Sequence, residues 1–340
     1  MSTSVPKFGV MDQGWAAPEV SDADAAKAVI ACIRLADELG FDSAWVGEHH
    51  HRRPDSPFWG RVPASEIVLG YAAALTSRIA LGGGVRILST TPAQRTAEEM
   101  SMLSVLTGGR VDFGIGLGSN QIAMKSREEK AAEFRRLLDE LLAVLRNAPG
   151  VTGELSPVSP VDITTRLWAA GRDELTIRHL AETGVNLVVG QAELGMVQAN
   201  YIRQYKAAGG KGRTRGVRLV FVAETDAKAI EDSAPAADLY YALMGKGNYQ
   251  KEALAKGLAT EPKTREEMLD FVNFIVGSPE TVTRKLNTYL ATTGVDQLDA
   301  MVNIPRVGPE NFARTLRLLQ AEVRPQLRYG VAAEALSSVA

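Results

Sequence analysis

Three of the four histidines in the chain are consecutive, and they follow a short apolar run. The run 43–46 predicts a buried strand, and Glu48 leads from it into His49, His50 and His51. An imidazole titrates near neutral pH, so a histidine at a strand end could act as a general base that Glu48 orients. Adjacent side chains of an extended segment point to opposite sides, so three consecutive histidines converge poorly on one metal ion. We therefore predict proton-transfer chemistry and no metal site, with a solvated loop end as the plainer alternative.

A second group of residues suggests contact with a phosphate. Gly114, Gly116 and Gly118 end another apolar run, and a helical pattern begins near Ser126. Glycine lets backbone N–H groups approach a phosphate closely. A dinucleotide fingerprint would occupy the first strand–helix turn of its domain, with an acidic residue about 20 positions later. Because three strand–helix units precede these glycines, we discount a dinucleotide-binding fold.

Two further turns could approach a ligand. Three glycines at 82–84 follow a predicted strand at 79–81, and either close approach of a ligand, a bulge or a tight turn could explain them. Gly171, Arg172 and Asp173 stand between a predicted strand and a predicted helix. Backbone amides at that helix start could bind an anion, or Asp173 could simply cap the helix.

All four groups of residues lie where strands alternate with helices. The predicted strands are 8–11, 43–46, 79–81, 111–115, 167–170, 186–189, 217–223 and 297–304. The predicted helices are 23–39, 64–76, 96–106, 126–147, 173–183, 193–207, one that opens near 226, and 310–323. This alternation indicates a parallel sheet, and eight units in 340 residues predict an α/β fold, a (β/α)8 TIM barrel with insertions at the C-terminal face of the strands. The carboxyl ends of barrel strands carry active sites, and the candidate residues fall there.

We expect residues 1–340 to form a single TIM-barrel domain, because no linker or charge run divides the chain. Two insertion segments interrupt the alternation. The segment 148–165 contains three prolines and predicts a loop. The segment 245–276 is rich in Gly, Lys and Glu and comes after the seventh strand. It is either a lid over the site or a surface excursion.

Composition excludes several classes of protein. The 38 Lys and Arg residues nearly balance the 40 Asp and Glu residues, so the chain carries no basic excess for nucleic acid. No apolar stretch reaches the roughly 18 residues that indicate a membrane span. The single cysteine, Cys32, cannot form an internal disulfide, and the N-terminus lacks the pattern of a signal peptide. We therefore expect a cytoplasmic enzyme with no nucleic-acid or membrane partner.

Three blocks of the sequence resemble the bacterial luciferase-like flavin-dependent monooxygenases. The first block, 35–50, contains Gly-Phe-Asp, an aromatic-containing strand and Glu-His-His. The second block, 95–118, contains Leu-x-x-Leu-Thr-Gly-Gly-Arg and then Gly-x-Gly-x-Gly. The third block, 277–295, begins with Gly-Ser-Pro-Glu and ends with Gly-Val. The blocks occur in the order of the family and cover nearly the whole chain.

The resemblance implies a TIM barrel that binds reduced FMN. In the family, reduced flavin reacts with O2 to give a C4a-peroxyflavin, which oxygenates a small organic substrate. A separate NAD(P)H:flavin reductase would supply the reduced FMN, since the chain shows no nicotinamide fingerprint of its own. The resemblance also suggests a homodimer that forms through helices near the second and third units.

Carried over residue by residue, His49 matches the catalytic histidine of the family, and Glu48 and His50 flank it. Gly84 and Val85 match a non-prolyl cis peptide over which the isoalloxazine ring packs.

The phosphate of the flavin is assigned to two turns by the same comparison. Gly116, Leu117 and Gly118 match the flavin-phosphate segment after the fourth strand. Ala170 and Gly171 match a second phosphate-contacting turn.

The chain departs from the family at charged positions. The luciferases carry an arginine where this chain has Leu117 and a glutamate where it has Ala170. Arg86, Arg172 and Lys125 could supply the missing positive charge. The family histidine before the third helix is also absent, although the arginine that follows it is retained as Arg95.

Two alternatives remain for the function. Related barrels bind the deazaflavin F420 and transfer hydride, although their second strand more often ends in Asp-His than in Glu-His-His. A non-catalytic luciferase-like flavin-binding subunit would be expected to lack the histidine after the second strand, and His49 is retained here.

Overall fold

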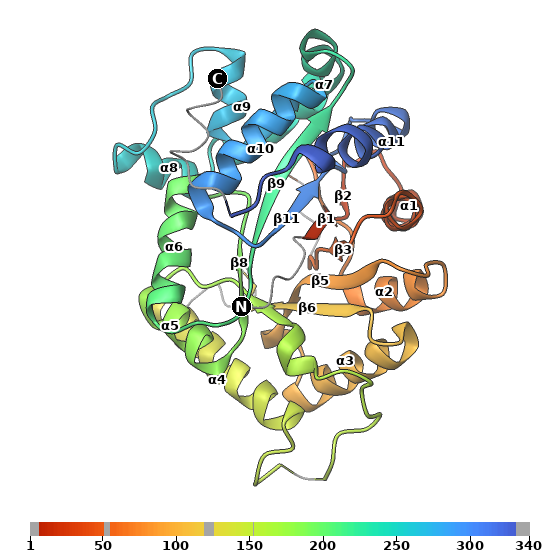
Figure 1. The fold of residues 1–340 in the computed structure, drawn as a ribbon, viewed down its shortest axis with the longest axis vertical. Coiled ribbons are helices and arrows are strands. Elements are labelled where there is room, and N and C mark those ends of the chain that lie inside the picture. The colour runs from red at the N-terminus through yellow and green to blue at the C-terminus, as the bar shows by residue number, and fades with distance from the viewer. Residues whose placement is uncertain (1–6, 51–54, 119–125, 152, 331–340) are drawn as a thin grey trace.

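The computed structural model describes residues 7–50, 55–118, 126–151 and 153–330 (Figure 1). Within these residues, eight parallel strands close into a barrel, each hydrogen-bonded to the next along the chain and the last to the first. They are β1 (Lys7–Asp12), β3 (Ser43–Val46), β5 (Ala80–Ile87), β6 (Val111–Gly116), β7 (Leu167–Ala169), β8 (Asn186–Val189), β9 (Thr214–Val222) and β11 (Gln297–Met301). The predicted (β/α)8 barrel is confirmed.

Helices surround the barrel (Figure 1). They are α1 (Asp22–Leu39), α2 (Ser65–Ala73), α3 (Ala93–Thr107), α4 (Arg127–Leu145), α5 (Glu174–Thr183), α6 (Gly195–Ala207), α7 (Asp226–Met244), α8 (Asn248–Ala255), α9 (Arg265–Phe271), α10 (Pro279–Thr293) and α11 (Pro309–Leu318). Glycines in the left-handed conformation end several of them, including Gly40 after α1 and Gly108 after α3, as expected of residues without a Cβ. None of the helices in the described part of the chain is long and apolar enough to span a membrane.

Three short strands escaped sequence analysis. β10 (Phe274–Gly277) pairs with the C-terminal half of β9, on the edge that β8 occupies at the N-terminal half. β2 (Trp15–Ala16) and β4 (Trp59–Gly60) form a separate antiparallel pair. β2 and β4 have only two residues each, which is too few to show a periodic pattern, and β10 lies at the end of the insertion segment 245–276, where no strand was predicted.

The third barrel strand is longer than predicted, and the tight-turn interpretation of its three glycines is wrong. β5 continues through all three glycines to Ile87, with a register shift against β6 between Gly83 and Arg86. A Cβ at Gly82 would lie 2.6 Å from the Trp45 ring. Gly82 therefore makes room for an indole inside the barrel.

Apolar side chains fill the layer between strands and helices, as Leu138 and Leu141 of α4 illustrate, both fully buried. The barrel interior differs, because it contains buried charges beside indole rings. β9 begins three residues earlier than predicted, and this extension brings Arg215 into the interior.

The two insertion segments lie at different ends of the barrel. The segment 245–276 contains α8, α9 and most of β10. Gln250 and Asn273 of this segment donate hydrogen bonds to the carbonyl oxygen of Ala192, which follows the C-terminal end of β8. The segment 148–165 instead leads into the N-terminal end of β7, and its Ser159 bonds Ser104 of α3.

Candidate active site

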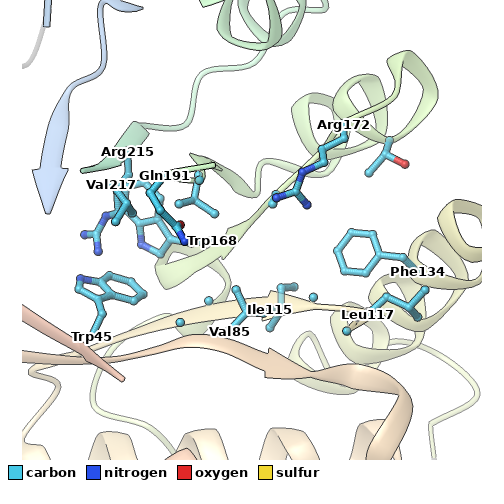
Figure 2. Close-up of a pocket in the computed structure, with 18 of the residues that line it drawn as sticks. Trp45, Val85, Ile115, Leu117, Phe134, Trp168, Arg172, Gln191, Arg215 and Val217 are labelled. Atoms are coloured by element: carbon cyan, nitrogen blue, oxygen red, sulfur yellow. The ribbon is translucent and has the colours of Figure 1, made fainter. Parts of the chain in front are cut away.

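A cavity of about 400 Å³ opens at the C-terminal ends of the barrel strands. Its volume is within the range of roughly 300–1,000 Å³ that is typical of small-molecule sites. Figure 2 shows that the cavity has two ends, with Val85 and Ile115 between them. We call the end that contains Leu117, Phe134 and Arg172 the outer end. The inner end contains Trp45, Trp168, Gln191, Arg215 and Val217.

Most of the residues predicted to bind the cofactor line this cavity. They are Gly84, Val85, Gly116, Leu117, Gly118 and Ala170. Gly171 is not among the lining residues, because it packs against α5, where a Cβ would lie 2.9 Å from the Ile177 side chain. The structure therefore brings the glycine turn after β6 and the end of β5 to one wall.

This wall is shaped by the absence of side chains. The Gly84–Val85 peptide bond is cis, as the family resemblance led us to expect. A Cβ at Gly116 would lie 2.7 Å from Cγ2 of Val85, and a Cβ at Gly114 would lie 2.4 Å from the carbonyl oxygen of Gly83. The backbones of β5 and β6 thus present a side-chain-poor surface that a flat ring system could cover.

Positive charge gathers at the outer end. Arg172, Arg127 and Lys130 all line the cavity there. The Nε of Arg172 donates a hydrogen bond to Glu193, with 2.5 Å between the two atoms. Asp173 caps α5 by accepting from the backbone N–H of Thr176, so the capping interpretation of this turn is confirmed. Arg127 and Lys130, in the first turns of α4, were missed because the sequence did not show that α4 starts at the cavity.

The other two cations considered for this role differ in position. Arg86 points into a cluster of carboxylates and donates to Glu48, Glu66 and Glu99 at 3.0–3.2 Å. It does not line the cavity. Lys125 lies outside the described residues.

The inner end contains a buried arginine between two indole rings. The guanidinium carbon of Arg215 lies 3.7 Å from the centroid of Trp45 and 4.4 Å from that of Trp168. Its Nη1 lies 3.2 Å from a carboxylate oxygen of Asp299, and its Nη2 donates to Gln297 at 2.7 Å. Burial raises the pKa of Asp299 to about 6, although Arg215 opposes the rise. Sequence analysis missed this group because the predicted strand began after Arg215.

Glu48 and His50 lie together, but neither lines the cavity. His50 Nε2 lies 2.8 Å from Glu48 Oε1, and the second carboxylate oxygen accepts from Arg86. The backbone N–H of Ile87 also donates to Glu48. Glu48 therefore ties the end of β3 to the end of β5, close to the cis peptide.

His49 does not line the cavity, but it contacts a residue that does. Its Nε2 lies 2.7 Å from Oε1 of Gln13, and Gln13 lines the cavity. Gln13 directs its amide nitrogen to the sulfur of Met11, so its oxygen faces His49. An amide oxygen can only accept a hydrogen bond, so Nε2 of His49 is the donor. His51 lies outside the described residues.

Comparison with known proteins identifies the family. The model of the luciferase-like monooxygenase family matches residues 6–297. The chain belongs to this family.

Named relatives and solved structures are similar over different lengths. N-acetyl-S-alkylcysteine monooxygenase of Bacillus subtilis (strain 168) is 30% identical over 54% of this chain and 56% of its own length. The chain thus spans about half the length of such curated relatives. The structure of apo-MsnO8 is 26% identical, with a TM-score of 0.76 over 95% of this chain and 100% of that one. The oxygenating constituent of 3,6-diketocamphane monooxygenase from Pseudomonas putida, solved with FMN, shares the fold, with a TM-score of 0.80, 19% identity and coverage of 96% of this chain and 100% of that one.

Proposed function

We propose that this protein is an oxidoreductase that uses reduced FMN and O2 to oxygenate a small organic substrate. The observation that carries the proposal is the side-chain-poor wall of Gly84, Val85 and Gly116, which ends at a cluster of cations. A flat ring on that wall would extend its phosphate toward the cations. The complex of the 3,6-diketocamphane enzyme with FMN supports this choice of cofactor.

The residues present fit such a cofactor. Gly84 and Val85 would contact the ring, and Gly116 to Gly118 would offer backbone N–H groups to the phosphate side. When bound, reduced flavin supplies the electrons for activating O2. A separate NAD(P)H:flavin reductase would provide it. The substrate would enter toward the inner end, where two indole rings and Gln191 offer apolar contact and an amide.

The chain's own polar residues would position protons near the ring. In this proposal His49 is the catalytic histidine and holds Gln13, which lines the cavity. Glu48 and His50 would support it from behind the wall. The segment 245–276 would act as the lid that excludes water, since Gln250 and Asn273 bond the loop beside the cavity.

The test is an anaerobic mixture of the protein with reduced FMN, followed by rapid addition of O2 while the flavin spectrum is recorded. We expect the time course of oxidation to differ from that of free reduced FMN. Oxidation at the rate of free flavin would contradict the proposal.

A second candidate is an F420-dependent oxidoreductase. The F420-dependent tetrahydromethanopterin reductase from Methanopyrus kandleri shares the fold, with a TM-score of 0.66 over 96% of this chain and 100% of that one, at 18% identity. Titration with F420 distinguishes the two, because binding of F420 without binding of FMN would favour hydride transfer.

We also propose a homodimer of this single-domain chain. The surface formed by α2, α3 and the segment 148–165 exposes large apolar side chains. Exposed fractions there are 70% for Ile67, 62% for Tyr71, 60% for Leu106 and 82% for Val158. Such a patch is typical of a protein interface. The buried free thiol of Cys32 fits a cytoplasmic location.

A further inference from the structure

Arg172 occupies a distinctive position at the outer end of the cavity. It follows β7 in the turn before α5, and its side chain extends into the cavity at the end that Leu117 and Phe134 also line (Figure 2). The side chain is 37% exposed, so an anion entering the cavity can reach it. The position after β6 where the luciferases carry an arginine is Leu117 here, and it lines the same end.

The guanidinium of Arg172 uses only part of its hydrogen-bonding capacity within the described residues. Within the described residues, Nε bonds Glu193, and no other hydrogen bond of this side chain is formed. The two terminal nitrogens therefore offer their N–H groups toward the cavity. Planar guanidinium donors match two oxygens of a phosphate at once, which gives short and strong charge-assisted hydrogen bonds.

Arg172 also contacts the segment 245–276. Its guanidinium carbon lies 5.4 Å from the centroid of the Tyr249 ring in α8, within the range of a cation–π contact. Arg127 is a second cation that lines the cavity. Its Nη1 lies 4.0 Å from Oε2 of Glu252, which also belongs to α8. Burial raises the pKa of Tyr249, and both arginines oppose that rise, so both lie near this phenol.

The counter-ion of Arg172 is connected to the same segment. Glu193 belongs to the loop after β8, and its backbone carbonyl accepts from Asn273. The neighbouring carbonyl of Ala192 accepts from Gln250 of α8. The loop after β8, which holds Arg172 through Glu193, is thus hydrogen-bonded to residues near both ends of the segment 245–276.

Building on the proposed function, we propose that Arg172 is the phosphate-binding cation of this chain, and that an anion bound there holds α8 against the barrel. The ligand group is a phosphate monoester at the end of a flavin side chain. An anion would fix the guanidinium under Tyr249 and would attract Arg127, which pairs with α8. Binding of the phosphate and docking of the 245–276 segment would then stabilise each other.

The experiment compares two oxidised flavins that differ only in the phosphate. Affinities of FMN and riboflavin are measured by quenching of flavin fluorescence for the wild-type protein and for Arg172→Met. We expect the wild type to prefer FMN, and the variant to lose roughly 10- to 100-fold in FMN affinity with riboflavin affinity unchanged. Arg178→Met is the matched control, because Arg178 is an exposed arginine of the adjacent helix α5 that pairs with Glu174.

A second variant tests the sign of the charge effect. Glu193→Gln keeps an oxygen that can accept from Nε of Arg172 but removes the negative charge beside it. We expect this variant to bind FMN more tightly than the wild type and riboflavin equally well. Equal FMN-to-riboflavin ratios in the wild type, Arg172→Met and Glu193→Gln would overturn the proposal.

Hydrogen exchange of residues 248–255 tests the link to α8. Inorganic phosphate and FMN should each slow exchange in the wild type, whereas riboflavin should have a smaller effect, and Arg172→Met should abolish the effect of phosphate. If neither oxidised flavin binds, the phosphate measurement still decides the role of Arg172, and the reaction of reduced FMN with O2 separately decides the proposed function. Exchange that phosphate leaves unchanged in the wild type would contradict the link.

Discussion

Nε2 of His49 lies 2.7 Å from Oε1 of Gln13, and it is Gln13 that lines the cavity. The histidine therefore donates a hydrogen bond from Nε2 to the amide oxygen of Gln13, and it contacts the lining of the cavity through this residue. Two glycines accommodate this pair, because a Cβ at Gly47 would lie 2.2 Å from Oε1 of Gln13 and one at Gly60 would lie 2.1 Å from the His49 ring.

If His49 and Gln13 act as a unit, the effects of their substitutions on the reaction rate should not be additive. We expect His49→Ala and Gln13→Leu each to slow the reaction of bound reduced FMN with O2, on the order of 100-fold. The double variant should lose little more than either single one. Stopped-flow spectra of the three variants measure this, and losses that multiply would show independent roles.

The Gly116 position tests the wall of the cavity. Gly116→Ala places a Cβ 2.7 Å from Cγ2 of Val85, so the wall that would carry the ring must shift. We expect weaker FMN and riboflavin binding alike, by roughly tenfold. Gly195→Ala is the control, because a Cβ there meets its nearest atom at 3.7 Å. Flavin titration that shows equal affinity for the two variants would contradict this account.

The buried charges of the inner end should make stability depend on Arg215. Arg215→Met leaves Asp299 buried without the cation that it faces, which we expect to cost about 3–5 kcal/mol in the free energy of unfolding. Adding Asp299→Asn should restore part of that loss. Urea denaturation of the single and double variants provides the measurement, and Arg178→Met should be nearly neutral. A double variant no more stable than Arg215→Met would refute the pairing.

The buried carboxyl group of Asp299, which faces Arg215, also predicts that the free energy of unfolding depends on pH. The pKa of Asp299 is raised from 3.8 to about 6 by burial. Between about pH 4 and pH 6 the folded state thus binds more protons than the unfolded state, so stability falls as pH rises through this window. The loss is on the order of 3 kcal/mol. The wild type should therefore lose stability relative to Asp299→Asn as pH rises, in denaturation curves recorded across the window. Parallel pH profiles would be inconsistent with a raised pKa.

The proposed dimer can be broken at its apolar surface. Leu106→Glu places a charge among the exposed apolar side chains of α2 and α3. We expect the mass measured by light scattering to fall from that of a dimer to that of a monomer. Ile230→Glu is the control, because Ile230 is an exposed apolar residue of α7, away from this surface. A wild-type protein that is already monomeric would remove the proposal.

Local signals in the sequence determined the barrel and much of the side-chain-poor wall of the cavity. Hydrophobic patterns typical of strands and helices repeat along the chain, and glycines and capping residues mark the ends of these elements. The alternation of strands and helices can therefore be predicted without knowledge of tertiary contacts. The glycines at 114, 116 and 118 stand at the C-terminal end of such a strand, and barrel geometry alone carries them to the C-terminal face. The cis peptide at Gly84–Val85 was anticipated from the family resemblance.

The inner and outer ends of the cavity were decided by tertiary structure. Arg215 lies beside Trp45, Trp168 and Asp299, which come from strands far apart in the sequence. No local pattern in the sequence therefore predicts that these four residues meet. The histidine run predicted chemistry, but the closing of the barrel placed Gln13 between His49 and the cavity. Side-chain partners across strands depend on how the barrel closes, and closure is a property of the whole chain rather than of any one segment.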